Sequence, residues 1–238
     1  MSTASSSDPP SLLGLDAELA SSCVNCGLCL PHCPTFRVTG EERYSPRGRI
    51  DAMRAVDSGR LPIDSAFIDF VDTCVQCRGC EPACPSGVQF GALMEQTRTT
   101  LATSGTITPW WQRLGFGVLG RHRTLLVGST AIAAAQRARL VPQRLGLARL
   151  PLRRGRALTS TGTDVWLFTG CVMDAWQRET HRNTAALITM TGATYSIPGA
   201  QGACCGALHV HAGLHDDAVE FARRVIASMP GDAPIVVN

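Results

Sequence analysis

Lysine is absent from this sequence, and all 22 basic residues are arginine. We attribute that bias to codon usage in a GC-rich genome rather than to chemistry. Aromatic residues make up only 5% of the chain, so the core must depend on Leu, Val, Ile and Ala. No run of about 18 apolar residues occurs, which argues against a membrane-spanning helix.

A secretory signal is also missing, because residues 1–22 have neither the basic start nor the unbroken apolar run of a signal peptide. Without export, thiols stay reduced, so the 11 cysteines favour metal binding over disulfides. We therefore expect a cytoplasmic protein, either free or peripheral on the inner face of the cell membrane. Its length leaves room for two modest domains.

Acidic residues are missing from one long stretch. Residues 101–163 contain ten arginines and no Asp or Glu, whereas the rest of the chain has 12 arginines and 19 acids. Apolar residues such as Trp110, Trp111 and Leu114 alternate there with Arg113, a pattern compatible with an interfacial helix. One hypothesis is therefore an adaptor, with metal bound by its cysteines, that docks through this basic segment. A solvated helix pair facing an acidic partner explains the composition equally well, and we expect no nucleic-acid partner.

Two cysteine groups share the form C-x2-C-x2-C-x3-C-P. This spacing is typical of two-cluster ferredoxins, in which three cysteines of a group hold one [4Fe–4S] cluster and the fourth, before proline, reaches the other cluster. Zinc instead favours two separated C-x2-C pairs, which four cysteines in eleven residues do not provide. The expected ligands are Cys23, Cys26, Cys29 and Cys84 for the first cluster, and Cys74, Cys77, Cys80 and Cys33 for the second.

Hydrophobic periodicity predicts a helical setting for both groups and a different architecture after residue 164. Short apolar runs alternate there with helical stretches, which indicates an α/β arrangement with a parallel sheet. The predicted fold is α+β overall: a helical two-[4Fe–4S] ferredoxin-type domain followed by a partial α/β cysteine-rich domain. The expected helices are 46–56, 65–71, 90–101, 177–190 and 216–228, and the expected strands are 165–171, 193–198 and 234–238. The expected divisions are a flexible leader at 1–22, the ferredoxin-type domain at 23–100, a basic connecting segment at 101–163 and the cysteine-rich domain at 164–238.

Three further cysteines lie in the last region. Cys171 and the run Cys204-Cys205-Gly206 resemble the cysteine-rich CCG domain of heterodisulfide reductases and of relatives that oxidise hydroxy acids. The resemblance implies a third redox or metal site at Cys171, Cys204 and Cys205, with buried inert thiols as the alternative. In that family another cysteine pair follows, so the chain resembles the N-terminal part of a longer subunit.

The histidines of this region carry weaker signals. His209 and His211 follow the Cys-Cys-Gly run. They are candidate metal ligands or proton carriers, and the alternative is that they are ordinary hydrogen-bonding groups. His181 and His215 are expected on helix surfaces, without a role.

The residues Tyr44-Ser45-Pro46-Arg47-Gly48-Arg49-Ile50 and the run after Cys-Cys-Gly narrow the resemblance to the iron–sulfur subunits of bacterial glycolate oxidase. That resemblance implies a non-catalytic electron-transfer subunit. Separate flavin-bearing subunits would oxidise glycolate, and electrons would continue to a quinone or another acceptor. Related subunits for lactate, glycerol 3-phosphate or heterodisulfides remain alternatives, because the partner fixes the substrate.

The chain shows no active site of its own. It has no G-x-G-x-x-G motif after a strand to bind a flavin or nicotinamide dinucleotide, and no nucleophile–base pair. We therefore expect flavin only on the partner subunits, no catalytic residues here, and an isolated chain that is inactive.

Overall fold

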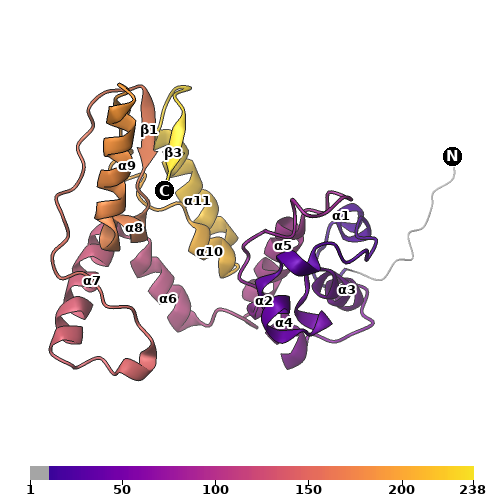
Figure 1. Ribbon diagram of the computed structural model, residues 1–238. Coiled ribbons are helices and arrows are strands. Elements are labelled where there is room, and N and C mark those ends of the chain that lie inside the picture. Colours follow the sequence, from indigo (N-terminus) through magenta and orange to yellow (C-terminus); the bar gives the residue numbers. More distant parts are fainter. Residues whose placement is uncertain (1–10) are drawn as a thin grey trace. The chain divides into compact units, whose positions relative to one another are not determined.

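The computed structural model describes residues 11–238, which form two compact units. The first unit contains residues 11–109 together with His209–His215, and the second contains Trp110–Leu208 and Asp216–Asn238. The predicted α+β class is confirmed: most described residues in regular structure are helical, and a small parallel sheet lies in the second unit (Figure 1). In the described part of the chain, no helix combines the length and the apolar character needed to cross a membrane.

Helices build the first unit. The three predicted around the cysteine groups are confirmed as α3 (Pro46–Asp57), α4 (Ser65–Asp72) and α5 (Phe90–Thr103). Each of the first two begins at a side-chain cap, because Ser45 Oγ accepts from the Gly48 amide at 3.0 Å and Asp64 accepts from the Phe67 amide at 2.9 Å. The shorter helices are α1 (Ala17–Ser21), η1 (Leu30–His32), α2 (Pro34–Thr39) and η2 (Glu42–Tyr44).

The core of the first unit lies where α3, α4 and α5 meet. Ile50, Met53 and Val56 occupy the buried face of α3 that their spacing predicts. Phe67 and Val71 of α4 pack into the same cluster. This core also contacts both cysteine groups, because four half-buried cysteines pack against it: Cys23, Cys29, Cys74 and Cys84. The helices therefore hold the cysteine loops on a common support.

The leader expected at residues 1–22 has two parts. Residues 1–10 lie outside the described residues. In the remainder, Leu13 and Leu15 are buried in the core of the first unit, and the Leu13 amide donates to the Asp57 carboxylate at 2.8 Å. Residues 11–22 thus contribute to the packing of this unit.

Gly48 permits the tightest backbone approach next to the cysteine groups. A Cβ atom at this position would lie 2.1 Å from the carbonyl oxygen of Glu42, in η2. Only glycine allows that approach. It presses η2 onto the start of α3 and thereby positions Arg47 and Arg49, which flank Gly48 on α3.

A three-stranded parallel sheet organises the second unit. Its order is β2-β1-β3, with β1 (Val165–Phe168) between β2 (Tyr195–Ser196) and β3 (Ile235–Val237). Leu167 is fully buried against Ala185 of α9 (Arg178–Met190) and Tyr195 of β2. The alternation of strands and helices predicted after residue 164 is therefore confirmed. The remaining helices of this region are α8 (Cys171–Trp176), α10 (Ala207–His211) and α11 (His215–Ser228).

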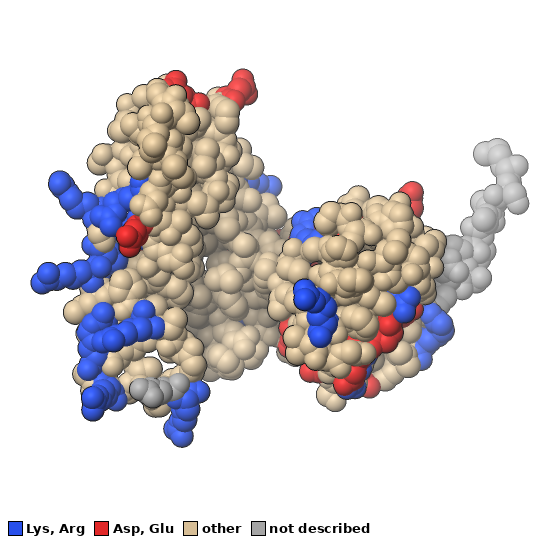
Figure 2. All heavy atoms as spheres, viewed as in Figure 1, with Lys and Arg blue, Asp and Glu red and all other residues tan. Residues whose placement is uncertain are grey.

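The first part of the basic stretch is helical, and the chain from residue 146 to residue 163 is not. The helical part contains α6 (Trp110–Leu119), α7 (His122–Arg137) and η3 (Gln143–Leu145), all within the second unit. The indole Nε1 of Trp176 in α8 donates to Ser129 Oγ of α7 at 2.9 Å, so α7 packs on the cysteine-rich region. Figure 2 shows arginine side chains gathered over α7 and the chain that follows it. Trp110, the first residue of α6, is 76% exposed.

Candidate functional site

A small cavity in the first unit joins the two cysteine groups. Cys33, from the end of the first group, lines it together with Cys74, Cys77 and Cys80 of the second group. Sequence reasoning assigns this set of four to the second cluster. The turn before α2 brings Cys33 there, since the Cys33 sulfur contacts Thr35 Oγ1 at 3.1 Å and the Tyr44 carbonyl at 3.5 Å.

The backbone of the two cysteine loops repeats an unusual conformation. Asn25 and Gly27 have positive φ angles of 56° and 82° in the first loop. At the equivalent places of the second loop, Gln76 and Arg78 have φ angles of 50° and 56°. Non-glycine residues adopt this left-handed region at a cost of about 1–3 kcal/mol. Such turns aim successive N–H groups into a concavity that suits an anion, as in many iron–sulfur sites.

Three of the cysteines that line the first loop and the cavity have perturbed thiols. Burial raises the pKa of Cys80 to about 12, and the nearby Cys29 and Cys74 sulfurs add to that effect. Burial likewise raises the pKa of Cys29 and of Cys74. Thiols must lose their protons to bind a metal. In the absence of iron, these thiols are therefore held protonated, and they lie close enough to influence one another across the two groups.

The first loop is held by arginines from α3. Arg47 donates to the Asn25 carbonyl at 2.8 Å, and Arg54 donates to the Cys23 carbonyl at 3.0 Å. Cys23, Cys26 and Cys29 come together in this loop, since Cys23 and Cys26 lie near enough to contribute to the raised pKa of the Cys29 thiol. Cys84 is half-buried against the same core as Cys23 and Cys29.

Within residues 11–238, no group of three or more His, Cys, Asp or Glu side chains is arranged to hold a single metal ion. Four thiolates around one zinc stand at about 2.3 Å from the same ion. Each cysteine of a [4Fe–4S] cluster binds a different iron, so its sulfurs stand further apart. The eight thiols and the repeated left-handed turns fit clusters of that kind.

In the second unit, Cys171 and Cys204 form a thiol pair. Cys171 is the first residue of α8, directly after β1, and its thiol donates a hydrogen bond to the Cys204 sulfur. That bond and the Gly206 amide lower the pKa of Cys204, whereas the same bond and burial raise the pKa of Cys171. Cys205 is exposed and close enough to act on Cys171. The three cysteines that sequence reasoning groups are thus near one another.

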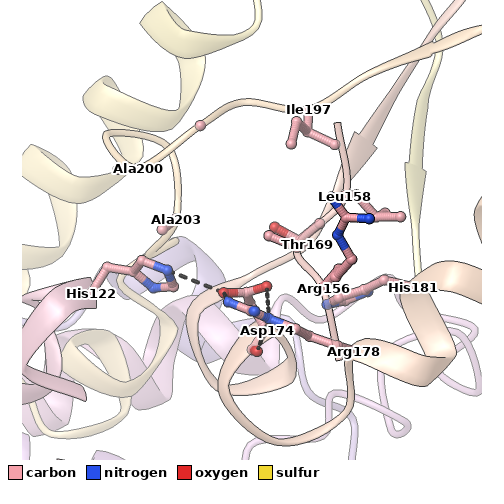
Figure 3. Close-up of a pocket in the computed structure, with 12 residues that line it drawn as sticks. His122, Arg156, Leu158, Thr169, Asp174, Arg178, His181, Ile197, Ala200 and Ala203 are labelled. Carbon is pink, nitrogen blue, oxygen red and sulfur yellow. Dashed lines mark hydrogen bonds and ion pairs between the residues drawn. The ribbon is translucent and has the colours of Figure 1, made fainter. Parts of the chain in front are cut away.

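The second unit contains another cavity, of about 170 Å³. Two of its lining residues, Thr169 and Ala203, are close in the sequence to Cys171 and Cys204. In Figure 3, His122 and Arg178 point toward the carboxylate of Asp174 from opposite sides. His122 Nε2 is 3.1 Å from Asp174, and Arg178 pairs with both carboxylate oxygens at 2.9 Å. These contacts of Asp174 tie α7, α8 and α9 together around the cavity.

The structure corrects one expectation at this cavity. Sequence reasoning puts His181 on a helix surface, but the residue is 1% exposed and lines the cavity (Figure 3). Its Nδ1 lies 3.0 Å from the Asn238 side chain, after β3. A helix packed on a sheet buries the face that meets the strands, and a lone histidine in a polar stretch gives no signal of that. His215 is exposed, as expected.

His209 and His211 do not join a metal site among the described residues. His209 is buried, and burial together with the charge of Arg98 lowers the pKa of His211. The segment around them packs in the first unit: Arg98 donates to the His211 carbonyl, and Thr108 Oγ1 donates to the Ala212 carbonyl at 2.6 Å. Their position therefore favours a packing role over metal binding.

Two protein families match the chain. The 4Fe-4S dicluster domain matches residues 19–88, and the cysteine-rich domain matches residues 165–238. No solved structure matches the chain. The two matched ranges correspond to the two cysteine-bearing regions described above.

Curated relatives share both regions. The chain is 34% identical to the probable glycolate oxidase iron-sulfur subunit of Bacillus subtilis, over 87% of this chain and 53% of that protein. It is 28% identical to the glycolate oxidase iron-sulfur subunit of Escherichia coli, over 89% of this chain and 53% of the relative. It is 25% identical to a subunit of the dihydromethanophenazine:CoB--CoM heterodisulfide reductase of Methanosarcina mazei, over 93% of this chain and 55% of that relative. The chain therefore spans about half the length of the curated relatives it matches.

These relatives are subunits of oxidoreductases, and the two matched domains contain the cysteines described here. The chain accordingly combines a 4Fe-4S dicluster domain with a cysteine-rich domain, and over most of its length it is similar to iron–sulfur subunits of glycolate oxidase.

Proposed function

We propose that this chain is the electron-transfer part of a glycolate oxidase-type complex and holds two [4Fe–4S] clusters with exchanged ligands. The observation that carries the proposal is the cavity lined by Cys33 together with Cys74, Cys77 and Cys80. A cysteine from the first group at a cavity of the second group is what the two-cluster spacing requires. By the same exchange, Cys84 joins Cys23, Cys26 and Cys29.

When bound, such clusters accept and release single electrons. The residues of the chain bind the clusters and determine their surroundings. The thiols of the eight cysteines give up their protons and bind iron. The left-handed turns at Asn25 and Gln76 aim amide groups toward negative charge. The apolar core on which the cysteines rest limits access of water to one side of each loop.

The proposed partners rest on the resemblance to glycolate oxidase subunits. The two glycolate oxidase relatives are more similar to it than the heterodisulfide reductase relative, at 34% and 28% against 25% identity. We therefore assign glycolate as the substrate of the whole complex, with flavin on separate subunits and a quinone or another carrier as acceptor. The rival within the same class is a subunit for another hydroxy acid, glycerol 3-phosphate or a heterodisulfide.

The cysteine-rich region supports a third redox or metal site. Cys171, Cys204 and Cys205 lie near one another, and hydrogen bonds favour the thiolate at Cys204. A thiolate is the form that binds metals and reacts with disulfides. We propose that these three cysteines contribute to such a site with groups from outside this chain.

Metal analysis tests the central claim. Protein purified or reconstituted without oxygen should carry about eight iron atoms and about eight acid-labile sulfides per chain, as two clusters require. One tightly bound zinc without labile sulfide would sink the proposal.

Enzyme assays test the division of labour. This chain alone should not oxidise glycolate with any electron acceptor. The same chain combined with the matching flavin subunits should do so, and glycolate should then reduce its clusters. Glycolate oxidation by the isolated chain would contradict the assignment of catalysis to partners. Liposome binding that depends on salt, without binding to flavin subunits, would instead favour the adaptor hypothesis.

A further inference from the structure

Arg49 is a buried cation without an ionic partner among the described residues. It is 1% exposed, and its guanidinium group donates to the Phe70 carbonyl at 2.6 Å and to Thr35 Oγ1 and Thr73 Oγ1 at 3.1 Å each. The Tyr44 carbonyl accepts a further bond from the same group. All of these acceptors are neutral, and no ion pair among residues 11–238 includes Arg49. Its charge therefore has no carboxylate within residues 11–238 to balance it.

Burial of an unbalanced charge is strongly unfavourable unless something negative lies nearby. Among the described residues, cysteines of the second cluster lie near Arg49 and become negatively charged when they bind iron. Arg49 Nη1 lies 4.0 Å from the Cys33 sulfur, and Arg49 lines the same cavity as Cys33 and Cys74. Each thiol is neutral without metal and carries negative charge when it binds iron.

Arg98 adds a second buried cation next to Cys74. It is 7% exposed, and it donates to the carbonyls of Val71 at 2.7 Å and Cys74 at 2.9 Å. The exposed carboxylate of Asp72 acts on Arg98 from a distance without pairing with it directly. Arg78, which also lines the cavity, is neutralised by Glu81 at 2.8 Å.

The arginines at the first cysteine loop are arranged differently. Arg47 pairs with Glu42 at 2.5 Å, and Arg54 pairs with Asp51 at 3.2 Å. Their carboxylates offset the positive charge next to the first loop. The two cluster positions thus differ: buried, unbalanced arginines flank the second, and ion-paired arginines flank the first.

We propose that Arg49 supplies the counter-charge of the second cluster and raises its reduction potential above that of the first cluster. This inference rests on the proposed function. A one-electron reduction adds one negative charge to a cluster without breaking a bond. Fixed positive charge in a buried setting stabilises that added charge, because the surroundings screen it weakly. An electron that enters the chain then resides mainly on the second cluster, which is the one bound by Cys33, Cys74, Cys77 and Cys80.

Redox titration of the full chain, loaded with clusters and reduced stepwise by dithionite, tests the inference. Electron paramagnetic resonance follows each cluster, and the signal that changes or disappears in Cys33→Ser identifies the second one. Arg49→Gln should make reduction of the second cluster at least about tenfold less favourable, a shift of about 59 mV for a one-electron couple. Arg49→Lys keeps the charge and should retain most of the wild-type potential. Arg47→Gln, at the first loop, is the matched control and should leave the second potential unchanged.

Several outcomes would overturn the inference. The first is a wild-type protein whose second cluster has a lower reduction potential than its first cluster. The second is an Arg49→Gln variant with unchanged reduction potentials. The third is an equal fall of the second cluster's reduction potential in Arg49→Gln and Arg49→Lys. If Arg49→Gln fails to hold the second cluster, Arg49→Lys decides by its potential. Loss of that cluster from both variants would assign Arg49 to the fold alone. A wild-type chain that binds no clusters would refute the proposed function instead, before any potential is compared.

Discussion

The exchange of Cys33 and Cys84 between clusters can be tested by counting iron in paired variants. Cys33→Ser removes one thiol from the cavity that Cys74, Cys77 and Cys80 line. If that cavity holds the second cluster, iron should fall from about eight to about four atoms per chain, because each cluster contains four. A single variant does not reveal which cluster was lost, so the informative step is the second substitution.

Cys33→Ser combined with Cys77→Ser damages the same cluster twice and should still retain about four iron atoms. Cys33→Ser combined with Cys26→Ser damages both clusters and should retain almost none. Uncrossed ligands predict the opposite pair of results, although both double variants carry equally small changes. Retention of about four iron atoms by Cys26→Ser with Cys33→Ser would therefore falsify the crossed assignment. Labile sulfide and the visible spectrum provide parallel measurements.

Three further results are expected. Gly48→Ala should destabilise the fold by about 1–3 kcal/mol, because the added methyl group meets the Glu42 carbonyl. Gly128→Ala, in α7, has no atom within 4 Å of the added group and should stabilise the fold by about 0.5–1 kcal/mol. Equal changes in the unfolding free energy of the two variants, measured by chemical unfolding, would contradict this. In iron-free protein, unfolding free energy should fall as pH rises from about 9 toward about 12, since the raised pKa of Cys80 means that the folded state holds its proton more tightly. Cys80→Ala should reduce that slope, and an unchanged slope would refute the cause. Anaerobic loading with iron and sulfide should release protons and slow as pH falls, which a pH-indicator assay can follow.

Local patterns in the sequence were sufficient to predict the main helices and strands and the use of cysteines as ligands. The spacing of Ile50, Met53 and Val56 predicts one buried face of α3, and the structure buries all three. Capping by Ser45 and Asp64 fixes two helix starts through residues three positions away. The alternation of strands and helices after residue 164 likewise depends on short-range periodicity.

Features that depend on distant parts of the chain were not accessible in this way. The burial of His181 arises because α9 packs on the sheet, and its neighbour Asn238 lies 57 positions away in the chain. The basic stretch reads as a connector because it has no acids of its own. Its α7 is nevertheless anchored to α8 by the bond from Trp176 to Ser129, and its His122 pairs with Asp174 outside the stretch.

The candidate site likewise combines features that local sequence predicts with features that only the tertiary structure determines. Eight cysteines at two repeated spacings are a local property, because three thiols on one loop surround a cluster whatever the rest of the chain does. The charge around them is a tertiary property. Arg47 and Arg49 stand two residues apart in one motif, yet the fold turns Arg47 toward Glu42 and buries Arg49 beside Cys33 with neutral acceptors only. The sequence therefore determined that this chain carries iron–sulfur ligands, while only packing decided which arginine is left without a carboxylate, since burial depends on neighbours that the local pattern does not contain.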